Sequence, residues 1–153
     1  MSPQKIRPCL WFDGQAEEAA RFYVSIFPNS AITGTTPGPN GRPMVVEFRL
    51  AGSQFLALNG GPHFQFNEAI SLSVDCQGQG EVDELWEKLV EGGSPSRCGW
   101  LKDRYGLSWQ IVPASLSRLL AEPDAERVGR VMEALMQMSK LDIGALEAAA
   151  AGA

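Results

Sequence analysis

The chain has 153 residues, of which 44% are apolar, and a formal net charge of −5. That length suits one compact domain plus a tail, and that apolar content suffices for a core. The negative charge and the lack of any Lys/Arg cluster argue against a nucleic-acid partner. No apolar run approaches the ~20 residues that span a bilayer, and the first residues lack a signal peptide's apolar segment. We therefore expect a cytoplasmic protein without a membrane partner.

The first half, residues 6–59, predicts a strand, a helix and then three strands. The opening strand covers residues 6–12 and ends at a turn. In the helix that follows, apolar residues recur at the three-and-four spacing of one buried face. These residues are Ala16, Ala19, Ala20, Tyr23, Ile26 and Phe27. Pro28 and Asn29 end the helix, and strands are predicted over residues 31–35, 45–50 and 55–58.

The second half, residues 70–112, repeats this order. A strand over residues 70–74 is followed by a loose turn and by a second amphipathic helix, which ends at Gly92 and Gly93. Its apolar positions are Val82, Leu85, Trp86, Leu89 and Val90. Strands are predicted over residues 99–101 and 108–112. Two small sheets that each need a partner face can curl together, which predicts a pocket between them.

The tail, residues 114–153, is predicted to be helical and separate from the domain formed by residues 1–113. Asp124 can cap one helix and Asp142 a last short one. The first carries an apolar stripe formed by Val128, Val131, Met132, Leu135 and Met138. Such a stripe must be buried, and two alternatives stay open: packing on its own domain, or docking on a second subunit.

The cysteines predict reduced thiols. Cys9, Cys76 and Cys98 are an odd number, widely spaced and without a CxxC pair, which does not suit a disulfide framework or a structural zinc. A nucleophilic cysteine would need a base such as His63, the single histidine, and nothing local supports that pairing. Each cysteine is expected to be a small buried apolar residue.

Four blocks, residues 8–19, 21–23, 57–62 and 98–111, resemble the PhnB-like branch of the vicinal oxygen chelate superfamily. The resemblance extends over nearly the whole chain, the tail included. It implies an α+β fold in which two βαβββ modules form a cup-shaped mixed sheet, usually assembled as a homodimer with the site inside the cup. Members of this branch are often labelled demethylubiquinone methyltransferases. The wider superfamily includes glyoxalase I, fosfomycin- and bleomycin-resistance proteins and extradiol dioxygenases.

The resemblance also implies where a divalent metal would be held, by His and Glu side chains from four strands. Alignment on the shared Phe22 and Tyr23 puts the first position at Pro8, or at Arg7. The remaining positions are Ala57, Ala69 and Gln110. Only Gln110 offers an oxygen, and a lone neutral amide is a poor ligand for zinc, nickel or iron. We therefore expect no metal and no other cofactor.

His63 offers a less favoured alternative metal site. It follows Gly60, Gly61 and Pro62 in an expected loop, and Glu68 and Glu47 are the nearest carboxylates in the sequence. A loop histidine that hydrogen-bonds or titrates near the mouth of the cup is the favoured interpretation.

Strand alternation selects pocket residues in the first half. Cys9 and Trp11 share a face with Arg7, whereas Pro8, Leu10 and Phe12 form the face suited to pack on the helix. Glu47 and Arg49 also share a face, either toward the cup or toward solvent. Asn59 ends its strand and either lines the pocket or caps a turn.

In the second half, Ser71 and Ser73 face the same way, and residues 100–110 hold the densest chemistry. Trp100, Lys102 and Gln110 are expected in the pocket. Asp103 and Arg104 are expected to face water at a hairpin turn, while Trp100 and Trp109 are expected to form core or pocket wall.

Two functional hypotheses remain. The favoured one is capture of a small, aromatic or oxygenated molecule, with Trp11, Trp100 and Trp109 as stacking surfaces. The alternative is an enzyme of the methyltransferase, lyase, isomerase or dioxygenase type acting on a small metabolite, with Gln110, Glu47, Cys9 or His63 contributing. Methyl transfer from S-adenosylmethionine is disfavoured, because no strand, Gly-rich turn and helix run in succession.

Overall fold

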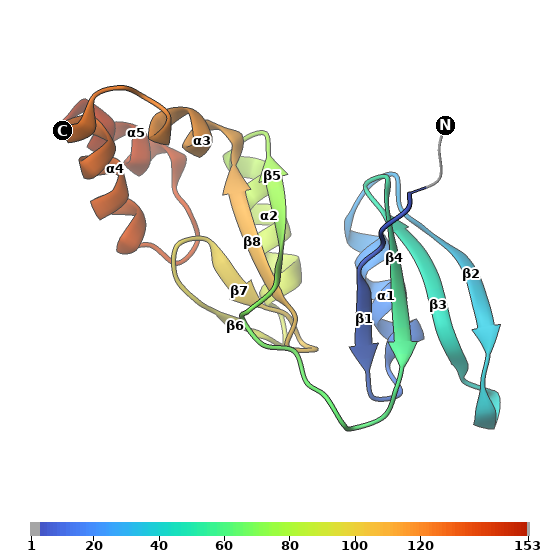
Figure 1. Ribbon diagram of the computed structural model, residues 1–153. Helices are drawn as coiled ribbons and strands as arrows, with labels where there is room; N and C mark the ends of the chain where they lie inside the picture. The colour runs from blue at the N-terminus through green and yellow to red at the C-terminus, as the bar shows by residue number, and fades with distance from the viewer. Residues whose placement is uncertain (1–3, 153) are drawn as a thin grey trace. The chain divides into compact units, whose positions relative to one another are not determined.

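A computed structural model describes residues 4–152 (Figure 1). The chain divides into two compact units between Phe66 and Asn67. Both are mixed α+β units, and the three tail helices belong to the second. Among residues 4–152, no helix combines the length and apolar character needed to cross a membrane.

The first unit is the predicted βαβββ module. Its sheet has the order β1-β4-β3-β2, in which β1 runs parallel to β4 and the other neighbours are antiparallel. The elements are β1 Cys9–Phe12, α1 Ala16–Ile26, β2 Ala31–Pro37, β3 Pro43–Leu50 and β4 Ser53–Asn59, with a 3-10 turn at Pro39–Gly41. Strands β2, β3 and β4 extend beyond their predicted limits, because pairing in the sheet extends beyond the apolar pattern. Strand β1 is shorter than predicted, since it begins at Cys9 rather than at residue 6.

The core of this unit lies between α1 and one face of the sheet. All six residues of the predicted apolar helix face are buried, which confirms that prediction. Tyr23 from α1 stacks on Phe48 of β3 with 6.3 Å between ring centroids, and Phe48 stacks on Phe55 of β4 at 5.4 Å. Leu10 and Phe12 of β1 are buried on the same side. The opposite face of the sheet carries the alternate residues.

The second unit repeats this topology, in the order β5-β8-β7-β6 with β5 parallel to β8. The elements are β5 Ser71–Cys76, α2 Gln79–Val90, β6 Ser94–Pro95, β7 Trp100–Lys102 and β8 Ser108–Pro113. Val82, Leu85, Trp86 and Leu89 of α2 are buried as predicted, together with Leu101, Trp109 and Ile111 of the sheet. Strand β6 was not predicted, because two residues give no periodic signal.

The prediction that Asp103 faces water at this hairpin turn is wrong. Asp103 is 2% exposed. Its Oδ1 accepts hydrogen bonds from the backbone N–H groups of Tyr105 at 2.8 Å and Leu107 at 3.1 Å, and its Oδ2 accepts one from Trp109 Nε1 at 2.9 Å. A buried carboxylate needs such donors to replace water. Arg104 is exposed, as predicted.

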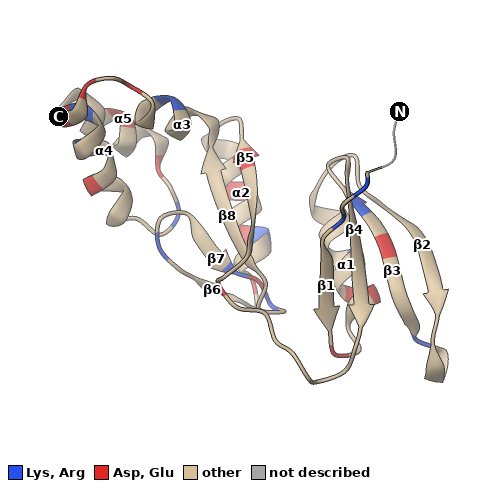
Figure 2. Cartoon of the chain, in the orientation of Figure 1, with Lys and Arg blue, Asp and Glu red and all other residues tan. Residues whose placement is uncertain are grey.

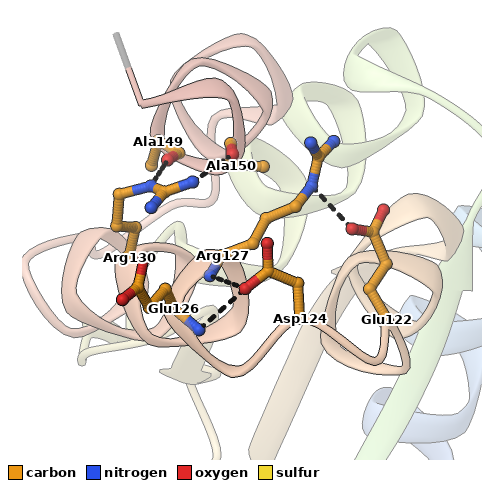
Figure 3. Close-up of polar contacts among 7 residues, drawn as sticks. All are labelled: Glu122, Asp124, Glu126, Arg127, Arg130, Ala149 and Ala150. Atoms are coloured by element: carbon orange, nitrogen blue, oxygen red, sulfur yellow. Dashed lines mark hydrogen bonds and ion pairs between the residues drawn. The ribbon is translucent and has the colours of Figure 1, made fainter.

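The tail forms three helices, α3 Ala114–Leu120, α4 Ala125–Met136 and α5 Ile143–Ala151. The predicted caps are confirmed: Asp124 accepts from the N–H groups of Glu126 and Arg127, and Asp142 accepts from that of Ala145. The sequence analysis did not separate α3 from the rest of the tail. Figure 3 shows Arg130 of α4 donating to the carbonyl oxygens of Ala149 and Ala150, both at 2.9 Å, which ties α4 to the end of α5.

The tail packs on its own unit, as the first of the two alternatives requires. Leu116, Val131, Leu135, Leu141, Leu146 and Ala150 form a cluster against which Cys98 and Val112 also pack. Gln79 at the start of α2 donates to the carbonyl oxygen of Leu141 and accepts from the N–H of Ile143. Met132 and Met136 stay 40% and 59% exposed, and docking of the tail on a second subunit stays a prediction.

Candidate ligand-binding site

The second sheet has one face covered by α2, and its other face collects the predicted site residues. Leu101 and Trp109 are buried on the α2 side. Because successive residues of a strand point to opposite faces, the residues next to them in β7 and β8 point to the other face. The strand register aligns Lys102 with Ser108, Trp100 with Gln110, and Gln110 with Ser73. Five sequence-predicted residues therefore share this open face: Ser71, Ser73, Trp100, Lys102 and Gln110.

A hollow of about 160 Å³ is lined in part by residues of this face, Trp100, Lys102 and Ser108. Its wall is formed by residues 94–96 and 100–102, with Ser108 and Glu68. Trp100 contributes a half-buried indole. An engineered cavity of about 150 Å³ accommodates benzene, so the hollow has room for one ring-sized molecule.

Lys102 and Glu68 form an ion pair at the edge of the hollow. The hydrogen bond from Lys102 lowers the pKa of the Glu68 carboxyl below its ordinary value. Glu68 belongs to the irregular segment before β5, and no local sequence pattern predicts that it meets Lys102.

Ser108 is the buried polar group of the hollow. It is 1% exposed, and its Oγ has no hydrogen-bond partner among residues 4–152. Buried hydroxyls are normally satisfied, so this one marks a place where a ligand or water oxygen can bind. The sequence signal that could have identified Ser108 is its position two residues before Gln110, because residues two apart in a strand lie on the same face.

Gln110 and Ser71 are joined across the strand pair. Gln110 Nε2 donates to Ser71 Oγ at 2.9 Å. Gln110 Oε1 has no donor in the described part of the chain and can accept from a ligand.

The open face of the first sheet carries four further predicted residues, Cys9, Trp11, Glu47 and Arg49, at alternate positions of β1 and β3. Glu47 is paired with Arg7 at 2.8 Å, and both are partly exposed. Arg49 is half-buried, and its buried Nε has no hydrogen-bond partner among the described residues.

Trp11 is held by the loop that follows β4. Its Nε1 donates to the carbonyl oxygen of Gly61 at 2.9 Å, and its ring meets Phe64 edge-on with centroids 4.8 Å apart. A Cβ on Gly60 would lie 2.3 Å from the indole, so this position requires glycine. His63 is exposed in the same loop.

Asn59 binds the start of helix α1 rather than the turn that follows its own strand. Its Oδ1 accepts from the N–H of Ala16 at the start of α1, and its Nδ2 donates to the carbonyl oxygen of Pro43. Register with the buried Phe12 puts Asn59 on the helix side of the sheet.

Among the cysteines, Cys76 alone is fully buried, so the expectation that all three are buried is wrong for the exposed Cys9 and the half-buried Cys98. Desolvation, with Glu81 nearby, raises the pKa of Cys76 to about 12. Partial desolvation also raises the pKa of the Cys9 thiol. Raised pKa values disfavour the thiolate that a nucleophile needs.

The expected metal positions do not suit a transition metal. Ala57 is fully buried on the α1 side of β4, so the sequence alignment put that position on the wrong face. Its neighbours Leu56 and Leu58 occupy the open face, and neither can bind a cation. Across residues 4–152, no three His, Cys, Asp or Glu side chains converge, and Gln110 alone is a poor donor set.

Known proteins place the chain in a family. The family model described as 3-demethylubiquinone-9 3-methyltransferase matches residues 4–112. The match ends before α3, so the resemblance does not extend over the tail as expected. No protein with a curated description matches the chain.

Solved structures agree with that match. The PhnB protein of Bacillus cereus is 33% identical, with a TM-score of 0.69 over 72% of this chain and 100% of its own. Protein PA1353 of Pseudomonas aeruginosa is 20% identical, with a TM-score of 0.60 over 72% of this chain and 98% of its own. The fosfomycin resistance protein FosX of Listeria monocytogenes, solved with Mn(II) and sulfate, is 18% identical, with a TM-score of 0.53 over 71% of this chain and 90% of its own. The last two show the fold alone. The chain therefore belongs to the PhnB-like, 3-demethylubiquinone-9 3-methyltransferase-like family and has the glyoxalase-like fold.

Proposed function

We propose that this protein binds a small aromatic or oxygenated molecule on the open face of its second sheet, without a transition metal. The observation that carries the proposal is the unpartnered, buried Ser108 hydroxyl in a hollow that Trp100 and Lys102 also line. Small-molecule sites combine apolar walls with a few convergent polar groups, and this hollow has both.

The chemistry of the face supports recognition rather than turnover. Trp100 offers a stacking surface, while Lys102 and Ser108 offer donors to a ligand oxygen. Gln110 Oε1 offers an acceptor. The described residues of this face include no histidine and no pair of acids at the spacing of an acid and base, so no reaction is assigned.

The methyltransferase description of the family is not extended to this chain. S-adenosylmethionine is commonly bound at a Gly-rich turn between a strand and a helix of a parallel sheet. Both sheets described here are four-stranded and mixed rather than parallel. The turn between β5 and α2 has two glycines, Gly78 and Gly80, but Asp83 stands where the dinucleotide fingerprint has its third glycine. S-adenosylmethionine should leave the melting temperature of the protein unchanged.

The test is titration of the full chain with phenol, catechol, benzyl alcohol and benzoate, followed by two-dimensional NMR. We expect at least one of these probes to shift the indole N–H signal of Trp100 and the amide signals of residues 100–102 and 108. Trp100→Ala should raise the Kd about tenfold, equivalent to about 1.4 kcal/mol. Met132→Ala, an exposed apolar change in the tail, is the matched control and should leave the Kd unchanged. Failure of all four probes to shift these signals would overturn the proposal.

A further inference from the structure

The ion pair at the hollow joins a residue of a paired strand to a residue of an irregular segment. Lys102 comes from β7, which pairs with β6 on one side and β8 on the other. Glu68 comes from the irregular segment before β5, and its side chain is 61% exposed compared with 40% for that of Lys102. Exposed ion pairs are weak, because water screens both charges and two long side chains must be ordered. Glu68 can therefore leave Lys102 at little cost.

Lys102 and Ser108 are directly opposite in the β7–β8 register. Side chains of opposite residues in antiparallel strands lie about 4.5–5.5 Å apart at their Cβ atoms and project from the same face. The wall of the hollow thus includes both Lys102 and Ser108, whose buried hydroxyl lacks a partner among residues 4–152.

We infer that the hollow takes the carboxylate of its ligand between Lys102 and Ser108, and that Glu68 occupies the Lys102 half of this position when no ligand is bound. This inference rests on the proposed function and names its ligand class. A carboxylate has two oxygens, so one can accept from the Lys102 ammonium and the other from the Ser108 hydroxyl. Without ligand, Glu68 is paired with Lys102. Binding exchanges one carboxylate for another at Lys102 and gives the Ser108 hydroxyl a partner.

A carboxylate suits this position better than a phosphate does. Among the described residues of the wall, Lys102 is the one cationic side chain. Once Glu68 has left Lys102, a carboxylate monoanion is matched by this single ammonium, whereas a phosphate dianion would leave one negative charge uncompensated. The size of the hollow, about 160 Å³, limits the occupant to a small acid such as an aromatic carboxylate over Trp100.

The test compares benzoate with its neutral isostere benzamide by NMR titration of the full chain. We expect benzoate to bind at least fivefold more tightly than benzamide. Glu68→Gln removes the internal competitor and should lower the benzoate Kd about fivefold. Glu84→Gln is the matched control, since Glu84 forms a similar exposed pair with Lys88 on α2, and it should leave the Kd unchanged.

Two further variants test the two donors. Lys102→Met should abolish the preference for benzoate over benzamide while benzamide still binds, and Ser108→Ala should weaken benzoate severalfold. Amide spectra of each variant check that the fold is retained. Equal binding of benzoate and benzamide would overturn the inference but leave the proposed function standing. An unchanged benzoate Kd in Glu68→Gln would overturn the role of Glu68. If neither probe binds the parent protein or Glu68→Gln, the inference fails, and the proposed function fails with it only if phenol, catechol and benzyl alcohol also leave the Trp100 and Ser108 signals unshifted.

Discussion

The two modules share one topology and are stabilised in different ways. The first has strands of 7 and 8 residues at β2 and β3, and an aromatic core in which Tyr23, Phe48 and Phe55 stack. The equivalent strands of the second, β6 and β7, have 2 and 3 residues. There the buried Asp103 holds the β7–β8 turn, and the tail helices extend the core. A short sheet thus needs polar bonding and added helices where a long sheet uses apolar burial.

Figure 2 shows where the charged residues lie in the two modules. Lys, Arg, Asp and Glu are dispersed over strands, loops and helices of both units. Ion pairs between exposed side chains contribute little to stability. The difference in how the two modules are stabilised therefore depends on their buried residues.

The largest expected effect tests the aromatic core of the first module. Phe48→Ala removes a fully buried ring and should lower the free energy of unfolding by about 3–5 kcal/mol. Phe64→Ala, at a ring that is 66% exposed, is the control and should have a much smaller effect. Hydrogen exchange should report lost protection in residues 9–59. Equal losses from the two variants would show that the aromatic stack does not stabilise this module.

The next effect tests the polar bonding of the second module. Asp103→Ala leaves three donors without their acceptor and should lower the free energy of unfolding by about 3 kcal/mol. Asp103→Asn can keep the two backbone bonds but sets an amide N–H₂ against the Trp109 indole N–H. Thermal unfolding should therefore show a smaller loss for Asn than for Ala.

A double-mutant cycle sharpens this result. Trp109→Phe removes the indole donor, so adding it to Asp103→Asn should cost less than the sum of the two single changes. Strict additivity would show that the bond from Trp109 to Asp103 does not stabilise the turn.

A moderate effect tests how the tail supports the second module. Gln79→Ala removes the bonds to Leu141 and Ile143 and should cost about 1–2 kcal/mol. Gln77→Ala, at an exposed position outside α2, should be neutral. Hydrogen exchange over residues 141–151 should rise in the first variant only. Unchanged exchange there would show that the tail docks without this glutamine.

The smallest effect comes from the Asp83–Lys140 pair, which joins α2 to the segment before α5 at 2.8 Å. The hydrogen bond from Lys140 lowers the pKa of Asp83. The pair's contribution is therefore present above the ordinary pKa of aspartate and is lost as the pH falls through the lowered value. The hydrogen bond to Asp83 also raises the pKa of Lys140, so the contribution is lost again as the pH rises through that value.

Lys140→Met measures this pair. The variant should show a slightly lower melting temperature at pH 7 and none of the difference at a pH below the Asp83 pKa or in high salt. A difference that persists in acid would assign the effect to packing of the Lys140 side chain.

The sequence indicated much of the fold because helix faces and helix caps are local. The apolar spacing of α1 and the caps at Asp124 and Asp142 depend on residues within a few turns, and all are confirmed. Strand β6 and the burial of Asp103 depend on contacts between elements, and local pattern does not reveal them.

The candidate site divides in the same way. Alternation correctly grouped Ser71 and Ser73, because a strand's period is fixed at two residues. Trp100, Lys102 and Gln110 were selected for their chemistry, and the strand register puts them on the same face. It did not reveal that Asn59 caps α1, that Ala57 faces that helix, or that Glu68 meets Lys102. The cup formed by both modules, the homodimer and the binding roles of these residues stay predictions. Light scattering of the purified protein would measure the oligomeric state.

By itself, the sequence determined two repeats of strand, helix and strands, because hydrophobic periodicity and turn residues act over short distances. The tertiary structure alone decided which polar groups are buried and which groups they pair with. Register brings Lys102 and Ser108 together across a hairpin, and a segment 34 residues earlier supplies Glu68. Such pairings depend on how segments that are far apart in the sequence pack together, so no local sequence pattern predicts them.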